Sequence, residues 1–306
     1  MRLAALLFVA IAAWGAERSP DAPDAPDALA IMQKMAANTD AAAEARRQYI
    51  YHQHVRSGLS KTNSQIICKE SREYTVIPQA STTERKLVSF DGECRKGNKM
   101  VPYSPPGQVQ PGMREKPATA GDRLAAQVTS DRESITGVID DLATDPKSRD
   151  GIPRQLFPLS GAEISRYQFR LKGDSTIKNR RAYDILFEPI DLKATCIDID
   201  EHGCSPWKGE AWIDAEDFQP VRIDTQLAKG VPWAFRVLMG INIRQLGFSL
   251  NYQRVAPGVW FPATYGTEFG IMAFWAYKRT ITLSMENTGF LKTDAQSTVE
   301  FDSSEP

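Results

Sequence analysis

Two histidines in the pattern His52-x-His54 are the first residues whose type and spacing suggest chemistry. In an extended strand, alternate residues project from the same face, so one ligand can contact both imidazoles, as in a metal site. The surrounding sequence offers no third ligand, and the 306 residues contain only three His and four Cys. Zinc sites and multi-metal centres are therefore disfavoured, and we expect an ordinary strand face with no metal and no other cofactor.

An acidic segment between Cys196 and Cys204 is a second candidate for a metal site. It has the sequence IDIDEHG and contains Asp198, Asp200 and Glu201, whose carboxylates suit calcium. The segment lacks the complete EF-hand pattern, because a histidine stands where an oxygen ligand is expected. An acidic hairpin tip is the favoured interpretation.

Glu210, Asp214 and Asp224 offer paired carboxylates of the kind used in acid–base catalysis. Residues four apart in a strand share a face, so Glu210 and Asp214 match this pattern within one strand. No serine nucleophile elbow, phosphate-binding loop or complete catalytic triad motif accompanies them. We therefore predict that the protein is not an enzyme, and keep a metal-dependent enzyme using His52 and His54 only as the weakest of three hypotheses.

The N-terminus, MRLAALLFVAIAAWGA, has the features of a secretory signal peptide. Arg2 precedes an apolar stretch from Leu3 to Trp14, and small residues follow before Glu17. At about 12 residues, the apolar stretch is shorter than the ~20 that a membrane-spanning helix needs. We expect cleavage of residues 1–16 and export to the periplasm or out of the cell, with no membrane-spanning segment in the mature protein.

Export changes the interpretation of the cysteines, because an oxidising compartment favours disulfides. Four cysteines allow three sets of pairs. Proximity in the sequence favours Cys68 with Cys94 and Cys196 with Cys204 as structural cross-links. Neither pair has the Cys-x-x-Cys spacing of a redox-active site.

The composition indicates a folded protein without a general affinity for nucleic acid. Hydrophobic residues make up 42% of the chain and charged residues 25%, and 37 Lys and Arg against 38 Asp and Glu give a net charge of −1. A nucleic-acid-binding surface would need an excess of basic residues. The length suggests about two domains, but residues 17–27, with their Pro-Asp-Ala repeats, form a spacer. We predict a single domain over 28–302, enlarged by a loop and helix insertion at about 95–160.

The body of the chain predicts an antiparallel meander rather than alternating strands and helices. Alternating apolar and polar residues begin at 48–55 and dominate after Phe157, with short connections between successive segments. Helices are expected after Asp27, an N-cap, and after Ser130, which opens a capping box. Further expectations are turns at Asp91-Gly92 and Lys172-Gly173-Asp174, separate strands at 64–68 and 74–78, and a surface loop over 95–119.

Four pieces of the chain together form a family pattern. They are NRRAYDILFEP (179–189), GEAWIDAEDFQPVRIDTQL (209–227), VAPGVWFPATY (255–265) and a final strand ending in TVEF. With its WID strand followed by a hairpin and a later W-x-P strand, the chain resembles the periplasmic carriers of outer-membrane lipoproteins (LolA-like proteins) and the related lipoprotein-sorting and sigma-regulator domains. This resemblance implies an α+β fold: a half-open antiparallel β-barrel, a curled sheet with helices across its concave face, enclosing an apolar cavity for acyl chains.

Acyl-chain binding needs a concave apolar surface that the protein's own core does not fill, since each CH2 removed from water contributes about 0.8 kcal/mol. Two apolar segments, 233–241 and 269–277, are the candidates, and the second is apolar on both faces of the expected strand. The candidate lining residues are Trp233, Phe235, Leu238, Met239, Phe269, Phe274 and Trp275. The alternative is that these side chains fill the core against the helices.

The leading hypothesis is an exported, non-enzymatic binding protein for a lipid or lipoprotein acyl chain, acting as in outer-membrane lipoprotein sorting. The helical lid would open, the chain would insert, and the protein would hand it to a partner without covalent chemistry. The alternative is a periplasmic sensor or scaffold, in which the same barrel binds an envelope protein and side chains fill the cavity.

Overall fold

The computed structural model describes residues 27–78, 83–104, 159–161, 163–190, 207–228, 241–244, 247–273 and 277–293. Two helical elements lie in these residues, α1 (Ala28–Arg46) and the single 3-10 turn η2 (Ile164–Arg166). The strands are β1 (Tyr49–Ser60), β2 (Ile66–Pro78), β3 (Thr83–Lys96), β4 (Lys99–Pro102), β5 (Tyr167–Ile177), β6 (Arg180–Pro189), β7 (Trp207–Asp214), β8 (Pro220–Leu227), β9 (Ile241–Arg244), β10 (Ser249–Ala256), β11 (Val259–Ala273) and β12 (Tyr277–Lys292).

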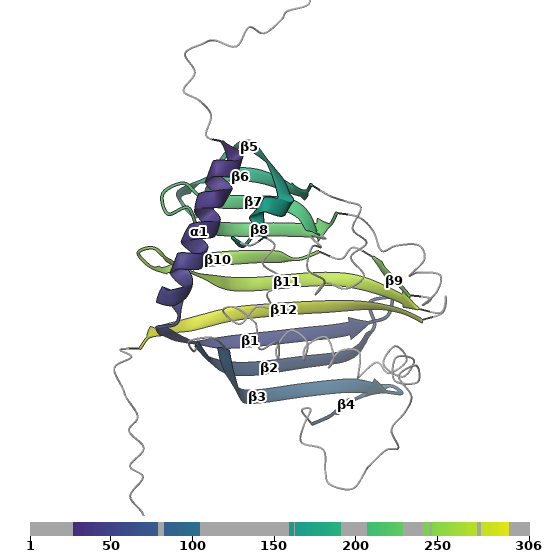
Figure 1. The fold of residues 1–306 in the computed structure, drawn as a ribbon. Coiled ribbons are helices and arrows are strands. Elements are labelled where there is room, and N and C mark those ends of the chain that lie inside the picture. The colour runs from purple at the N-terminus through teal and green to yellow at the C-terminus, as the bar shows by residue number, and fades with distance from the viewer. Residues whose placement is uncertain are drawn as a thin grey trace, which may run out of the picture.

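All of these strands belong to one antiparallel sheet, with the order β4-β3-β2-β1-β12-β11-β10-β8-β7-β6-β5 and with β9 paired to β11 beside this path. The first and last described strands, β1 and β12, pair from Tyr49↔Lys292 to Ser60↔Thr280 and join two meanders. The end strands β4 and β5 are not paired with each other, so the sheet is curled but not closed (Figure 1). The predicted half-open antiparallel barrel of the α+β class is confirmed.

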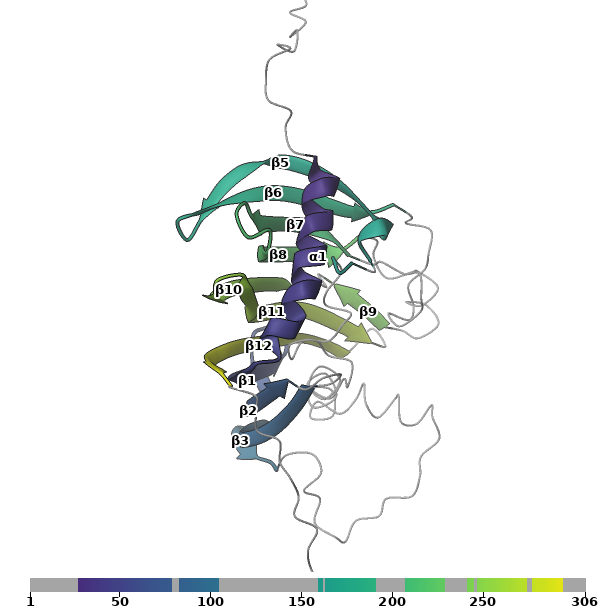
Figure 2. The ribbon, with the colours of Figure 1, turned by 60° about the vertical axis from the view of Figure 1, so that its left-hand side comes forward.

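Helix α1 begins where the sequence predicts, because the side chain of Asp27 accepts a hydrogen bond of 3.1 Å from the backbone N–H of Leu29. The helix lies on the concave face of the sheet. It crosses the strands from β5 toward β12 near one of their ends (Figures 1 and 2). Its Met32 and Met35 side chains are 0% and 2% exposed, and they pack in one apolar core with residues of nearly every strand. The helix expected after Ser130 lies outside the described residues.

Strand β2 corrects one prediction, because it joins the two strands expected at 64–68 and 74–78 into one. The segment between them, KESRE, is rich in charged residues. In the structure, Glu70 and Arg72 form an ion pair whose side chains are 0% and 5% exposed, so both stay on the buried face and the strand continues. A buried charge is tolerated when its partner lies beside it.

The predicted turns at Asp91-Gly92 and at Lys172-Gly173-Asp174 are wrong. Strand β3 continues through Gly92. A Cβ atom there would lie 2.7 Å from the ring of Tyr103, so the absence of a side chain leaves room for this ring and does not mark a turn. Strand β5 continues to Ile177 and turns at Lys178-Asn179, both with positive φ (49° and 63°), as the tightest hairpins require.

The loop expected over 95–119 also begins within the sheet, since β3 continues to Lys96 and β4 covers Lys99–Pro102. Residues 105–158, most of the predicted insertion, lie outside the described residues.

Cys68 and Cys94 lie opposite each other in β2 and β3 and form a disulfide, which confirms the first predicted pair. Cys196 and Cys204 lie outside the described residues. The confirmed bridge joins the neighbouring strands β2 and β3, next to the edge strand β4.

We expect the double variant Cys68→Ala/Cys94→Ala to have a free energy of unfolding about 3.5 kcal/mol lower than that of the oxidised protein. The reason is that the bridge closes a loop of about 27 residues in the unfolded chain and so lowers its entropy. Urea unfolding of the oxidised protein and the double variant measures this difference. Reduction of the unmodified chain serves as the control for the loss of side-chain packing. Equal stability of the oxidised, reduced and substituted proteins would contradict a structural role.

Candidate ligand-binding face

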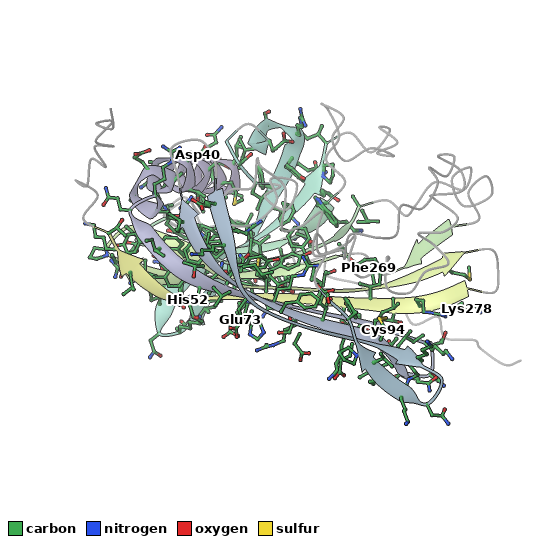
Figure 3. All side chains as sticks on the ribbon, turned by 90° about the horizontal axis from the view of Figure 1, so that it is seen from below. Asp40, His52, Glu73, Cys94, Phe269 and Lys278 are labelled. Atoms are coloured by element: carbon green, nitrogen blue, oxygen red, sulfur yellow. A yellow bond between two sulfur atoms is a disulfide. The ribbon has the colours of Figure 1, made fainter. Side chains whose placement is uncertain are left out.

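The two faces of the sheet differ in chemistry. Along β1, the side chains of Tyr51, Val55 and Leu59 are buried, whereas those of His52 and Arg56 are exposed. Figure 3 shows Phe269 on the side of the sheet where Asp40 of α1 lies, with His52 and Glu73 toward the other side. The concave face is therefore the apolar one, as the period of two in the sequence predicts.

Next to α1, the concave face is filled by the protein's own side chains. The aromatic rings of Tyr49 and Tyr51 contact Phe261 with centroid distances of 5.4 and 5.6 Å. Arg46, at the end of the helix, is 2% exposed and donates hydrogen bonds to the carbonyl oxygens of Trp260 and Thr39. This part of the face is core.

A second, separate apolar cluster lies on the concave face. Leu59, Ile67, Cys68 and Ile281 are its buried members, and Cys94 and Phe269 pack against them. Phe269 is therefore in apolar surroundings on the expected face. The other six candidate lining residues lie outside the described residues. They are Trp233, Phe235, Leu238, Met239, Phe274 and Trp275.

Aromatic rings extend along the same face from β7 to β11. Trp207 contacts Phe248 with a centroid distance of 5.0 Å, and Phe248 contacts Tyr265 at 5.6 Å. Burial raises the pKa of Tyr265, so its phenol stays protonated. The indole N–H of Trp207 and the hydroxyl of Ser57 are buried without a hydrogen-bond partner in the described part of the chain. Buried polar atoms of this kind are rare in folded proteins.

A charged pair lies between the two apolar clusters. Glu70 pairs across the sheet with Ser57, one row from the Cys68–Leu59 pair. Arg72 contacts Glu70, and the hydroxyl of Tyr103 also donates to Glu70. The sequence analysis did not identify this pair. Residues 68, 70, 72 and 74 alternate along β2 and therefore share one face, and this pattern could have revealed the pair.

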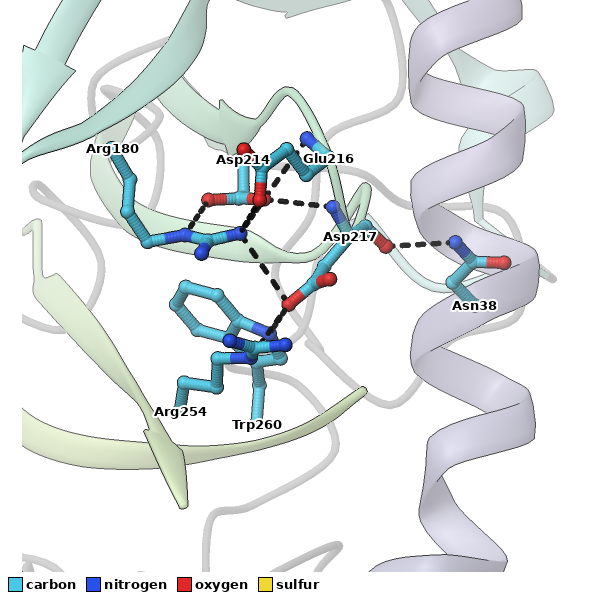
Figure 4. A network of polar contacts seen from close by, with 7 residues as sticks. All are labelled: Asn38, Arg180, Asp214, Glu216, Asp217, Arg254 and Trp260. Carbon is cyan, nitrogen blue, oxygen red and sulfur yellow. Dashed lines mark hydrogen bonds and ion pairs between the residues drawn. The ribbon is translucent and has the colours of Figure 1, made fainter. Parts of the chain in front are cut away.

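Asp214 organises the turn between β7 and β8 (Figure 4). Its carboxylate is 0% exposed and accepts two hydrogen bonds from Arg180, of 2.5 and 2.8 Å. The backbone N–H groups of Glu216 and Asp217 also donate to it, at 3.0 and 2.7 Å. Burial alone would raise the pKa of Asp214, but these donors outweigh it and hold the pKa below its usual range.

Asp217 extends this network to the helix and to two further strands. Its carboxylate accepts hydrogen bonds from Trp260 Nε1 at 2.9 Å and contacts Arg254 at 3.0 Å, and its carbonyl oxygen accepts one of 2.9 Å from Asn38 of α1. The turn that follows the WID motif therefore contacts Trp260, the first residue of the W-x-P motif. These motifs hold the turn, the helix and two strands together.

The two predicted carboxylate pairs both involve Asp214, which the structure instead pairs with Arg180. Glu210 and Asp224 lie opposite each other in β7 and β8, and each contacts a cation: Glu210 contacts Lys172 at 2.6 Å, and Asp224 contacts Arg222 at 2.8 Å. Asp184, which the sequence analysis did not consider, is the close neighbour of Glu210. Burial, followed by the hydrogen bond with Glu210, raises the pKa of Asp184 to about 6. The same hydrogen bond, together with Lys172, lowers the pKa of Glu210.

His54 lies in a Ser–His arrangement that does not suit nucleophilic catalysis. Its Nε2 is 2.6 Å from the hydroxyl of Ser71, and its Nδ1 is 2.9 Å from the guanidinium of Arg56. A guanidinium only donates, so Nδ1 accepts and Nε2 of the neutral ring carries the proton. The ring therefore donates to Ser71 and has no free position for the proton of that hydroxyl.

Metal ligands do not gather in the described residues, where no group of three or more His, Cys, Asp or Glu side chains could hold an ion. His52 is exposed on the convex face with its ring beside Gly289. The acidic segment with Asp198, Asp200 and Glu201 lies outside the described residues.

The fold and this face define a half-open barrel with one helix on its concave side. No protein-family model matches the chain, and no curated protein matches it. Solved structures with a similar course include a DUF1329 family protein from Desulfovibrio piger (12% identity, 89% of this chain and 96% of that chain, TM-score 0.33). A second is a LolA superfamily protein from Nitrosomonas europaea, with 14% identity over 88% of this chain and 95% of that chain and a TM-score of 0.30. A third is a chain of the MucA/MucB complex of Pseudomonas aeruginosa, with 13% identity over 88% of this chain and 100% of that chain and a TM-score of 0.26.

The structure from Nitrosomonas europaea is described as a LolA superfamily protein. Among the helices that the structure describes, none combines the length and the apolar character needed to cross a membrane.

We expect Asp214→Asn to lower the free energy of unfolding by roughly 3 kcal/mol, because it breaks a buried ion pair. Among the described residues, Arg180 then keeps only the exposed Glu216 at 2.9 Å and the more distant Asp217 at 3.6 Å as counterions. The matched control is Asp224→Asn, whose partner Arg222 is 46% exposed. Exposed pairs contribute about 1 kcal/mol or less. Urea unfolding measures both, and similar losses in the two variants would refute the central role of Asp214.

We expect Asp184→Asn to gain stability relative to the unmodified chain as the pH rises from about 5 to 7.5. The pKa of Asp184 is raised to about 6, so the native state retains a proton that the unfolded chain releases near pH 4. The contribution of this group to stability therefore falls as the pH rises through 4 to 6, and asparagine removes the dependence. Thermal unfolding at several pH values tests this. The control Asp174→Asn removes an exposed carboxylate paired with Arg181, and parallel pH curves for all three proteins would refute the prediction.

Proposed function

We propose that the chain is an exported binding protein, without covalent chemistry of its own, that holds a lipid or lipoprotein acyl chain against the concave face of the half-open sheet. The observation that carries the proposal is the second apolar cluster around Phe269. This cluster is separate from the core that α1 covers and faces the same side of the sheet. Its core is buried, and its partly buried member Phe269 provides apolar surface on the inner side of the unclosed sheet, which suits an alkyl chain.

The polar groups of the same face support a ligand with a polar end. The Trp207 indole N–H and the Ser57 hydroxyl have no partner in the described part of the chain. A buried donor without an acceptor costs about 1–3 kcal/mol. The carbonyl oxygen of an acyl ester or amide would accept from such a donor while the alkyl chain lies on the apolar residues.

The alternative function is a periplasmic sensor or scaffold that binds an envelope protein. Strand β3 supports it, because β4 pairs with β3 only over residues 93–96. Among the described residues, no strand pairs with the outer edge of residues 83–92. Leu87 and Val88 there are 41% and 61% exposed. An extended peptide could add a strand at such an edge.

Native mass spectrometry of the full chain, purified from the envelope of its own organism, separates the two functions. A retained lipid of defined mass supports the acyl-chain carrier. A lipid-free protein that purifies with one defined polypeptide overturns it in favour of the scaffold.

We expect Phe269→Ala to weaken binding of a fluorescent fatty acid about tenfold, because losing a large part of one aromatic contact removes about 1.5 kcal/mol. The matched control is Leu291→Ala, which truncates an apolar side chain that is 65% exposed. Probe displacement gives the affinities, and thermal unfolding checks that both variants fold. Equal affinity of the two variants would argue against this face as the binding site.

A further inference from the structure

A groove crosses four strands near the β5 end of the sheet, with a volume of about 640 Å³. It is lined by three consecutive residues from each strand: 168–170 of β5, 186–188 of β6, 208–210 of β7 and 224–226 of β8. This volume lies within the range of sites for small ligands, roughly 300–1,000 Å³.

The groove opens on the convex face, opposite α1. The middle residues of the first two triplets, Phe169 and Phe187, pack in the core. Because strand side chains alternate, the first and third residues of each triplet project from the convex face and form two walls. The backbone between these walls is the floor.

The acidic side chains of both walls already have donors. Glu188 accepts a hydrogen bond of 2.8 Å from Gln168, and Glu210 contacts Lys172 at 2.6 Å. Asp224 contacts Arg222 at 2.8 Å. Glu210 and Asp224 are thus paired with cations, and Glu188 has a neutral hydrogen-bond donor, so each of the three carboxylates has a partner outside any ligand.

The basic side chains of the walls are not compensated. Arg170 and Lys208 make no ion pair, hydrogen bond or ring contact in the described part of the chain. Arg170 lies on β5 in one wall and Lys208 on β7 in the other, with β6 between them. Two strand spacings amount to roughly 10 Å, so these long side chains can meet over the backbone of β6.

We propose that this groove binds a phosphate group, held between Arg170 and Lys208, from a phospholipid headgroup or a soluble phosphate ester. Phosphate presents several strong acceptor oxygens, and guanidinium and ammonium groups are its usual partners. The site is independent of the proposed acyl-chain face, because it lies on the other side of the sheet. The result for the phosphate site therefore does not decide whether the concave face binds an acyl chain.

Calorimetric titration of the full chain with inorganic phosphate tests the site, with chloride at equal ionic strength as the reference. We expect saturable binding that weakens at least tenfold in Arg170→Gln and in Lys208→Gln and is lost in the double variant. Lys61→Gln, which removes an exposed lysine outside the groove, keeps the affinity. Thermal unfolding checks that each variant is folded.

Two further titrations identify the source of the phosphate. Glycerol 3-phosphate represents a soluble ester, and phosphatidylglycerol vesicles represent a membrane surface. Tighter binding to either, lost in the double variant, supports the site and assigns its ligand. Phosphate binding no stronger than that of chloride, or equal affinity in the double variant, overturns the proposal.

Discussion

The buried carboxylate of Asp214 is the interaction on which the arrangement of helix and sheet depends. It neutralises Arg180 of β6 and accepts the N–H groups of the turn after β7. The turn then holds Asp217 where it contacts β10 and β11 and accepts a hydrogen bond from Asn38 of α1. This buried charge thus helps to determine where the helix crosses the concave face, because the backbone N–H groups of Glu216 and Asp217 depend on it as their acceptor.

Because α1 crosses only one end of the strands, it covers only part of the concave face. The core beside the helix is filled by side chains, whereas the cluster around Phe269 is separate from it. The Glu70–Arg72 pair lies between the two regions and keeps charge within an otherwise apolar face. An amphipathic ligand fits this distribution better than a purely apolar one, since polar groups buried in such a face require polar partners.

The strands could be predicted from the sequence wherever apolar residues alternate, as in β6 and β7, and the helix start could be predicted from Asp27. These signals are local, since they arise from side-chain direction and from capping within a few residues. The prediction failed where tertiary contacts override local preference. The charged segment KESRE continues strand β2 because Glu70 and Arg72 pair inside the fold. Gly92 looked like a turn until Tyr103 was seen to pack against it.

The sequence by itself determined the class of fold and the apolar and polar faces of its strands, and it favoured the pair Cys68 and Cys94, which the structure confirms. Only the tertiary structure decided which charged groups meet. Asp214 meets Arg180, Asp184 meets Glu210, and Arg170 and Lys208 have no counterion among the residues that the structure describes. The physical reason is that alternation places a side chain on a face, whereas register and curvature bring residues from different strands together. Of the predicted cavity residues, Phe269 alone lies in the described part of the chain, on the expected face.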